Sequence, residues 1–259
     1  MTAKLLILGP SGRMGRALIE GAAGRTDVRV VAAVDRPEAA GLQIGSLTST
    51  SDAAAGLDAS DVYIDFTSPA ATRSVAALAT ARKRAAVIGT TGLTADDEAA
   101  LAELAKVAPI VVAANFSLGV NLVLGLVRTA ASVLGPEWDA EVVETHHRAK
   151  RDAPSGTALM IARAIAAGHG SDYDAVKRHS RDGDIGPRPR GEIGVSAVRG
   201  GDVIGEHTAT FFGAAERIEI GHRATSRSIF AAGALRAAAW VVGKSPGRYD
   251  MLDVLGFAH

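Results

Sequence analysis

Five short apolar runs in the first 115 residues alternate with segments of helical periodicity, and this alternation restricts the fold more than any other feature. The runs are Leu5–Leu8, Val28–Val34, Val62–Phe66, Ala86–Ile88 and Ile110–Ala114. They lack the polar alternation of half-exposed strands, which is typical of parallel strands buried on both faces. The segments between them, such as Met14–Ala23 and Ala95–Lys106, gather apolar residues on one helical face. The sequence therefore predicts an α/β domain with a doubly wound parallel sheet.

Glycine-bearing or polar segments follow these runs. In chain order they read GPSGRMG, DRP, TSP, GTTG and ANFS. Ligands of open α/β sheets bind beyond the carboxyl ends of the strands, where such loops gather. We therefore expect a binding crevice along this edge of the sheet.

The pattern changes after residue 116. The predicted elements are then two helices, a strand between them, and three alternating segments that resemble antiparallel strands separated by glycine-rich turns. They are Leu118–Leu134, Ala140–His146, Thr157–Ala167, Ile193–Val198, Asp202–Phe212 and Arg217–His222. This order indicates an α+β domain built on a mixed or antiparallel sheet.

The tail from Ser226 to Trp240 again has a helical pattern, and we expect it to pack on the first domain. The predicted organisation is a Rossmann-type domain of residues 1–116 and 227–259, with the α+β domain formed by residues 117–226.

Charge and cysteine content argue against several classes of function. Lysine plus arginine and aspartate plus glutamate number 28 each, so no overall field would hold nucleic acid or an anionic membrane surface. The chain has no cysteine, which excludes a disulfide framework, thiolate zinc sites and a thiol nucleophile.

One charge-free span between Lys106 and Arg128 has the length of a membrane helix. Pro109, Asn115 and Ser117 interrupt it, and a buried strand, a turn and a helix describe it better. The opening MTAKLLILGP has too short an apolar run for a signal peptide. We therefore expect neither membrane insertion nor export.

Gly9, Gly12 and Gly15 follow the first strand with three-residue spacing. Glycines there permit a tight turn and bring a pyrophosphate close to a helix N-terminus, although a plain strand-to-helix turn has the same pattern. Asp35 ends the second strand about twenty residues later, where an acid accepts hydrogen bonds from ribose hydroxyls. Arg36 could pair with the 2′-phosphate of NADP, or belong to a solvated turn.

The segment EVVETHHRAKRDAPSGTA from Glu141 to Ala158 concentrates proton donors beside a helix start. His146, His147 and Lys150 supply donors and positive charge, and the free N–H groups of a helix N-terminus bind anions. Ser155 is the predicted N-cap, and capping alone would also explain this serine. Adjacent histidines on a strand point to opposite faces, so we expect no metal ion here. The segment therefore predicts a pocket for a small anionic molecule that receives a proton.

The same segment resembles the motif E-x-x-E-x-H-H-x-x-K-x-D-A-P-S-G-T-A of the 4-hydroxy-tetrahydrodipicolinate (dihydrodipicolinate) reductase family. The resemblance extends through GPSGRMGR, DFTSP, VIGTTG, ANFSLGVN, RGEIGVSAVRGGDVIGEHTATF and DMLDVLG. It implies a cytoplasmic homotetramer with a Rossmann domain completed by the C-terminal tail, and a central domain for substrate binding and tetramerisation.

Site residues follow from the resemblance by position. His146 is the expected acid/base residue and Lys150 the expected proton donor, with His147, Gly156 and Thr157 as substrate contacts. The expected contacts of the dinucleotide are Gly9, Pro10, Ser11, Gly12, Arg13, Met14, Asp35, Gly89, Thr90, Thr91, Ala113, Ala114, Asn115 and Phe116. Arg36 is expected to select for the phosphate of NADPH. Arg227 is a further candidate for binding a substrate carboxylate. Asp35 stands where some relatives have glutamate, which leaves the preference between NADH and NADPH open.

The implied reaction is reduction of a cyclic imine dicarboxylate by NADH or NADPH without a metal, with hydride transfer to C4 and protonation by the His146 and Lys150 pair. Two other functions fit the residues. The chain could be another dehydrogenase of the same two-domain plan, or a nucleotide-sensing protein that binds a metabolite without turnover. Oxidation of the cofactor in the presence of substrate distinguishes them.

Overall fold

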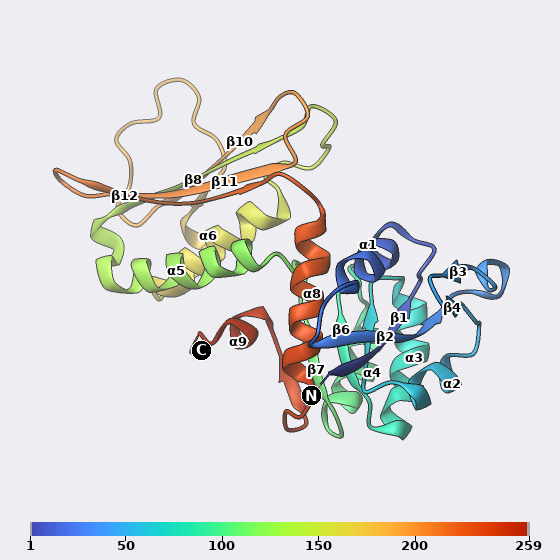
Figure 1. Cartoon of the computed structure of the whole chain (residues 1–259). Coiled ribbons are helices and arrows are strands. Elements are labelled where there is room, and N and C mark those ends of the chain that lie inside the picture. Colours follow the sequence, from blue (N-terminus) through green and yellow to red (C-terminus); the bar gives the residue numbers. More distant parts are fainter. Residues whose placement is uncertain (1, 258–259) are drawn as a thin grey trace. The chain divides into compact units, whose positions relative to one another are not determined.

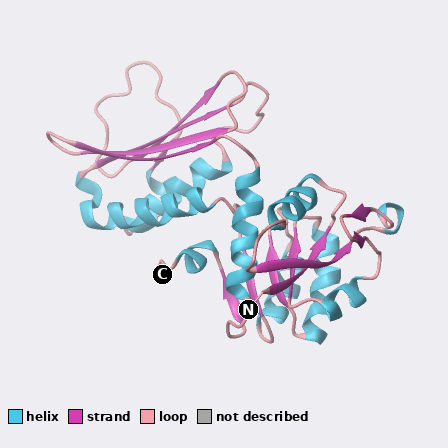
Figure 2. Ribbon diagram, in the orientation of Figure 1, coloured by secondary structure: helices cyan, strands magenta, loops and turns pink. Residues whose placement is uncertain are grey.

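The computed structural model describes residues 2–257, which form two compact units. The first unit comprises the residues up to Leu118 together with those from Ser228 onward, and the second comprises Gly119–Arg227. Each unit is built on a sheet of its own (Figures 1 and 2).

The sheet of the first unit has six strands in the order β13-β7-β6-β5-β1-β2, and every neighbouring pair is parallel. Its strands are β1 (Ala3–Leu8), β2 (Val28–Val34), β5 (Val62–Asp65), β6 (Ala85–Ile88), β7 (Pro109–Val112) and β13 (Gly247–Tyr249). Because the strands run in one direction, the loops after β1, β2, β5, β6 and β7 all leave from the same edge of the sheet.

Helices cover both faces of this sheet. Leu5 and Ile7 of β1 enter one core with α1 (Arg13–Ala22), α8 (Ser228–Val241) and α9 (Met251–Leu255). The alternate residues Leu6 and Leu8 enter a second core, which contains side chains of three further helices. These helices are α2 (Ala53–Ala59), α3 (Pro69–Arg82) and α4 (Ala95–Ala105). The predicted doubly wound parallel sheet is confirmed.

Several elements of the first unit were not anticipated from the sequence. They are η1 (Pro37–Ala39), the hairpin of β3 (Gln43–Ile44) and β4 (Leu47–Thr48), helices α2 and α9, and the edge strand β13. All are short, so periodicity carries little information about them.

The second unit has a five-stranded mixed sheet in the order β12-β11-β8-β10-β9. Helices α5 and α6 lie on one face of it (Figure 1). The elements are α5 (Leu118–Leu134), η2 (Gly135–Glu137), β8 (Asp139–His146), α6 (Gly156–Gly168), α7 (Tyr173–Val176), β9 (Lys177–Arg178), β10 (Ile193–Arg199), β11 (Gly205–Phe212) and β12 (Arg217–Ala224). An α+β unit with a mixed sheet is confirmed.

The segments Ile193–Val198 and Asp202–Phe212 were expected to be antiparallel strands separated by a glycine-rich turn. They run in opposite directions, but they do not pair with each other, because β8 lies between β10 and β11. β10 pairs with β8 in parallel, and β11 begins only at Gly205. The loop between them crosses the end of β8, where Gly200 N donates to His146 O at 3.0 Å and His147 N donates to Val203 O at 2.7 Å. Backbone groups beyond the end of β8 thus find partners in this loop.

Helix α5 and the turn after it, Leu118–Glu137, form the one helix among the described residues that is long and apolar enough to cross a membrane. Length and composition do not separate a membrane span from a core helix. Val120, Val123 and Val127 of this helix are buried in the chain, as is the polar Asn121. Leu122, Leu126 and Val133 of the same helix are exposed, so one face of the helix is buried and another is open.

Candidate active site

The glycine loop after β1 turns tightly into α1. Gly9 has a φ of +65°, which glycine adopts without strain, and a Cβ there would lie 2.9 Å from Cγ2 of Thr67. A Cβ on Gly15 would collide with the carbonyl oxygen of Gly9. Helix α1 begins after Gly12 without a side-chain cap. The first turn of α1 therefore offers backbone N–H groups to an anion.

A cavity of about 520 Å³ lies at this edge of the sheet, along the loops that follow β1, β2 and β5. Five of the predicted cofactor residues line it, namely Gly9, Ser11, Gly12, Asp35 and Arg36. Phe66, Thr67 and Ser74 line another part of it and were not predicted.

Asp35 is hydrogen-bonded to the glycine loop. Its carboxylate accepts hydrogen bonds from the backbone N–H of Ser11 at 3.0 Å and of Arg36 at 2.9 Å. Partial burial opposes ionisation, but the hydrogen bonds from Ser11 and Arg36 outweigh it and lower the pKa of Asp35. An ionised carboxylate thus faces the cavity beside the exposed side chain of Arg36.

The other predicted cofactor residues lie outside the lining of this cavity: Pro10, Arg13, Met14, Gly89, Thr90, Thr91, Ala113, Ala114, Asn115 and Phe116. Phe66 connects the cavity to two of them. Its ring packs edge-on against Phe116, with 5.2 Å between centroids, and a Cβ on Gly89 would collide with it. Thr90 is buried, where its hydroxyl lies 2.9 Å from that of Thr72.

The predicted catalytic segment joins β8 to α6 in the second unit. His146 is the last residue of β8 and is 8% exposed, while Gly156 and Thr157 open the 13-residue helix α6. Ser155 caps α6, since its Oγ accepts from Ala158 N at 3.2 Å. A Cβ on Gly156 would have no neighbour within 4 Å, so the space beside this residue is open.

Lys150 and the two histidines are placed differently. The ammonium of Lys150 lies 2.8 and 2.9 Å from the carboxylate oxygens of Asp152 and lowers the pKa of that carboxyl group. His146 belongs to the buried face of β8, whereas His147 follows the strand and is only half-buried. Because β8 ends at His146, strand alternation does not determine where the ring of His147 points. Arg227 is exposed between β12 and α8, and makes none of the contacts described here.

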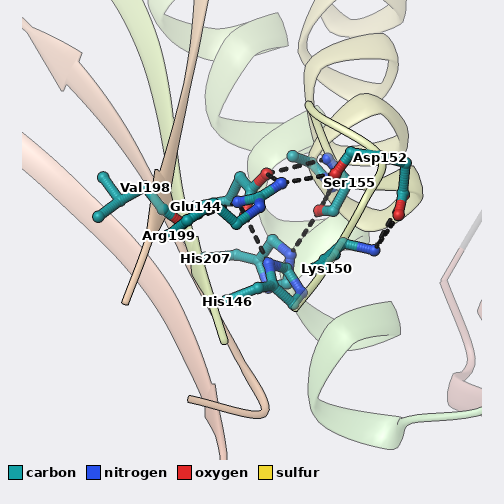
Figure 3. Close-up of polar contacts among 9 residues, drawn as sticks. Glu144, His146, Lys150, Asp152, Ser155, Val198, Arg199 and His207 are labelled. Carbon is teal, nitrogen blue, oxygen red and sulfur yellow. Dashed lines mark hydrogen bonds and ion pairs between the residues drawn. The ribbon is translucent and has the colours of Figure 1, made fainter. Parts of the chain in front are cut away.

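Glu144, Arg199 and His207 lie beside His146 (Figure 3). Glu144, which is fully buried, accepts from Nδ1 of His146 at 2.5 Å, and Arg199 binds the same carboxylate. His207 lies 3.1 Å from Oγ of Ser155, and its ring packs edge-on against that of His146.

Arg199 and His207 were not predicted as site residues from the sequence, and Glu144 was named only as part of the motif. A polar residue on the buried face of a predicted strand is the signal that identifies His207, because it alternates with the buried residues Ala209 and Phe211. Burial lowers the pKa of His207 to about 4, and the nearby groups His146, His222 and Lys150 act in the same direction, while the charge of Glu144 opposes them. The imidazole of His207 is therefore neutral at physiological pH.

Within residues 2–257, no group of three or more histidine, aspartate or glutamate side chains is arranged to hold a metal ion.

Known proteins with similar sequences cover the whole chain. The family model described as dihydrodipicolinate reductase, N-terminus, matches residues 3–116, and the model of its C-terminus matches residues 119–255. A 4-hydroxy-tetrahydrodipicolinate reductase of Alkalilimnicola ehrlichii is 48% identical over 99% of this chain and 100% of its own length. The corresponding protein of Myxococcus xanthus is also 48% identical, over 98% of each chain.

Solved structures agree at the level of the fold. A dihydrodipicolinate reductase from Paenisporosarcina sp. TG-14 with bound dipicolinate superposes with a TM-score of 0.79 and 24% identity over 98% of this chain and 99% of that chain. A probable dehydrogenase from Thermotoga maritima superposes with a TM-score of 0.64 and 12% identity over 97% and 92% of the two chains. Both family models and the full-length relatives lead to one conclusion: the chain belongs to the dihydrodipicolinate reductase family.

Proposed function

We propose that this chain reduces the conjugated cyclic imine dicarboxylate formed from 4-hydroxy-tetrahydrodipicolinate to tetrahydrodipicolinate, with NADH or NADPH as the reductant. As a member of the family it is an oxidoreductase of lysine and diaminopimelate biosynthesis. One observation carries the proposal. The imidazole of His146, which is hydrogen-bonded to Glu144, lies near the N-terminus of α6, where the space beside Gly156 is open.

The N-terminus of α6 suits a substrate carboxylate. The backbone N–H groups of Gly156 and Thr157 lie in the first turn, where the helix dipole favours negative charge. His147 and Lys150, which precede this turn, are the proposed side-chain contacts. We infer that binding and charge stabilisation come from this one segment.

NADH or NADPH supplies the hydride when bound. Adding a hydride to C4 of the substrate builds negative charge on its conjugated system, and that charge requires a proton. His146 and Lys150 are the proposed donors, and a positioned donor typically contributes about 10²–10⁴-fold in rate.

The cavity of the first unit suits a dinucleotide. The glycine loop leaves room for a pyrophosphate, and the ionised Asp35 can accept from the ribose hydroxyls that NADH presents. Arg36, on the same cavity wall, can pair with the 2′-phosphate of NADPH. We infer that the chain uses both cofactors.

We also propose that the chain works as a cytoplasmic homotetramer, assembled through the second unit. The face of its sheet opposite α5 and α6 carries exposed apolar residues on three strands, namely Val143, Val198 and Phe212. A sheet face with such residues gains stability when a partner covers it.

The test follows the absorbance of NADPH, and separately of NADH, while the protein receives substrate generated from pyruvate and aspartate semialdehyde by the preceding synthase. Oxidation that depends on both reagents supports the proposal and ranks the two cofactors. A folded protein that binds cofactor without oxidising it would favour the metabolite-binding alternative. Oxidation with another aldehyde or ketone in place of this substrate would indicate a different dehydrogenase.

A further inference from the structure

The position of Glu144 in the sheet places four polar side chains on one buried face. Glu144 is the register partner of His207 on β11 and of Ala197 on β10, and His146 is the partner of Arg199. Arg199 is therefore diagonal to Glu144, at a distance that a long side chain spans. Glu144 is fully buried, and His146 and His207 are 8% and 4% exposed.

The carboxylate of Glu144 is saturated with donors (Figure 3). Arg199 binds it with both terminal nitrogens, each at 2.9 Å. Nδ1 of His146 donates to Oε2, and the backbone N–H of Ser155 donates to Oε1 at 3.0 Å. Burial alone would raise the pKa of Glu144, but the bonds from Arg199, His146 and Ser155 lower it. Glu144 is therefore ionised and acts only as an acceptor.

An acceptor at this position decides which nitrogen of His146 carries the proton. A carboxylate can only accept, so the proton of the neutral ring sits on Nδ1 and leaves Nε2 as the basic atom. On the other side of the ring, a Cβ on Gly205 would lie 2.9 Å from Nε2. Glycine at position 205 thus avoids a Cβ that would crowd Nε2.

Arg199 also binds the loop that connects β8 to α6. Its Nη2 donates to the backbone carbonyl of Asp152 at 2.6 Å, and the carboxylate of Asp152 binds Lys150. With Ser155 N bound to Glu144, two points of the loop between His146 and α6 are tied to the sheet. The ion pair of Glu144 and Arg199 therefore contacts the ring of His146, the loop that carries Lys150 and the start of α6.

We propose that Glu144 and Arg199 are positioning residues, which present Nε2 of His146 for proton exchange and hold the loop that carries Lys150 in register with α6. The proposal rests on the function proposed above. Replacing a buried ion pair by apolar residues is often neutral or stabilising, so fold stability alone does not require this pair.

The first test is spectroscopic and measures the wild-type protein. In the wild-type protein labelled with ¹⁵N-histidine, the His146 ring, assigned by its loss in His146→Gln, should show a protonated Nδ1 and an unprotonated Nε2 at a pH where it is neutral. The opposite tautomer would overturn the proposal. Because this spectrum requires no turnover, it is independent of whether the reductase function is correct.

The second test uses kinetics with a matched control. Arg199→Met should lower kcat about 10-fold to 100-fold and leave NADH affinity unchanged, since loss of a group that orients a catalytic ring has effects of this order. Arg199→Lys, which keeps the charge but not the two-pronged geometry, should recover only part of the loss. The control is Arg178→Met, which breaks a similar pair on the same sheet, 3.0 Å from the buried Glu192, and should leave kcat within twofold of wild type.

Two kinetic results would contradict the proposal. A folded Arg199→Met protein with wild-type kcat gives the pair no positioning role, and an equal loss of kcat in Arg178→Met reduces it to general support of the sheet. Glu144→Gln serves where Arg199→Met does not fold, with the same expected loss of kcat. An inactive wild type, by contrast, would disprove the reductase function itself.

Discussion

At the scale of single residues, the side chains between Glu141 and Ala158 differ in their exposure. Lys150 and His147 are partly exposed, whereas Glu144, His146 and Ser155 are buried, and Glu144 is hydrogen-bonded to the other two. Substitution of an accessible residue should therefore change turnover with little change in stability.

Lys150→Ala tests this separation. We expect kcat to fall by about 10²–10⁴-fold, the usual contribution of a positioned proton donor, with the dissociation constant of NADPH nearly unchanged. Stopped-flow turnover and fluorescence titration measure the two quantities. Lys177→Ala is the control, because Lys177 also pairs with a surface aspartate, Asp174, in the same unit. Normal turnover with weakened cofactor binding would contradict the role of Lys150.

Arg36→Ala tests the cofactor preference. A charge-assisted hydrogen bond is worth about 1.5–3 kcal/mol, so losing one to the 2′-phosphate should raise the KM for NADPH roughly 10-fold to 100-fold. The KM for NADH should change little, because NADH lacks that phosphate. Equal changes for both cofactors would place Arg36 in a solvated turn without a selecting role.

The buried His207 should make the free energy of unfolding depend on pH. Its pKa in the folded chain is about 4, whereas an unfolded histidine has a pKa of about 6.5. The unfolded chain binds the proton more readily between these values, so the free energy of unfolding should decrease as pH falls from about 6.5 toward 4, by up to about 3 kcal/mol. His169 and His222, whose pKa values are also lowered by burial, add to this slope.

Urea unfolding at pH 7.0, 5.5 and 4.5 measures the effect, and His207→Gln should flatten the curve. Identical slopes in the variant and the wild type would show that His207 does not titrate as its burial indicates.

At the scale of elements, the helix starts determine both proposed binding sites. Helix α1 approaches its own glycine loop so closely that Gly15 has no room for a side chain, while α6 is capped by Ser155 and is open beside Gly156. The sequence identified both helix starts, because glycines and caps act over a few residues.

Gly15→Ala should destabilise the chain by about 1–3 kcal/mol and weaken NADH binding, since the new Cβ meets backbone atoms of Gly9 and Pro10. Gly21→Ala in the same helix is the control. There the nearest atom is the tip of Leu235 at 3.1 Å, and alanine favours the helix by about 1 kcal/mol. Thermal unfolding and cofactor titration compare the two, and equal losses would contradict the steric argument.

At the scale of the whole molecule, two separately built sheets carry the proposed functions. The residues proposed for the cofactor belong to the first unit, and those proposed for the substrate belong to the second. The second sheet also has the exposed apolar face proposed for assembly.

Phe212→Glu tests the assembly. A charge on the open face of the sheet should convert the proposed tetramer to smaller species in light scattering, because burying an unpaired carboxylate in an interface is costly. Val133→Glu is the control, since Val133 is the most exposed large apolar residue of the described chain, at 79%, and lies on α5 instead of the open face. A tetramer that survives Phe212→Glu and dissociates in Val133→Glu would place the interface on α5.

Features that arise from local physics are predictable without the folded structure. Buried parallel strands are apolar throughout, helix starts need caps or glycine, and the motif from Glu141 to Ala158 is contiguous, so the sheet class, the family resemblance and the candidates His146 and Lys150 could all be predicted. Tertiary structure alone decided which distant residues meet. The insertion of β8 between β10 and β11 brings Arg199 and His207 beside Glu144, more than fifty residues away, through sheet register. Which strands become neighbours depends on packing between segments that are far apart in the sequence, so the local pattern of one strand does not identify its partners.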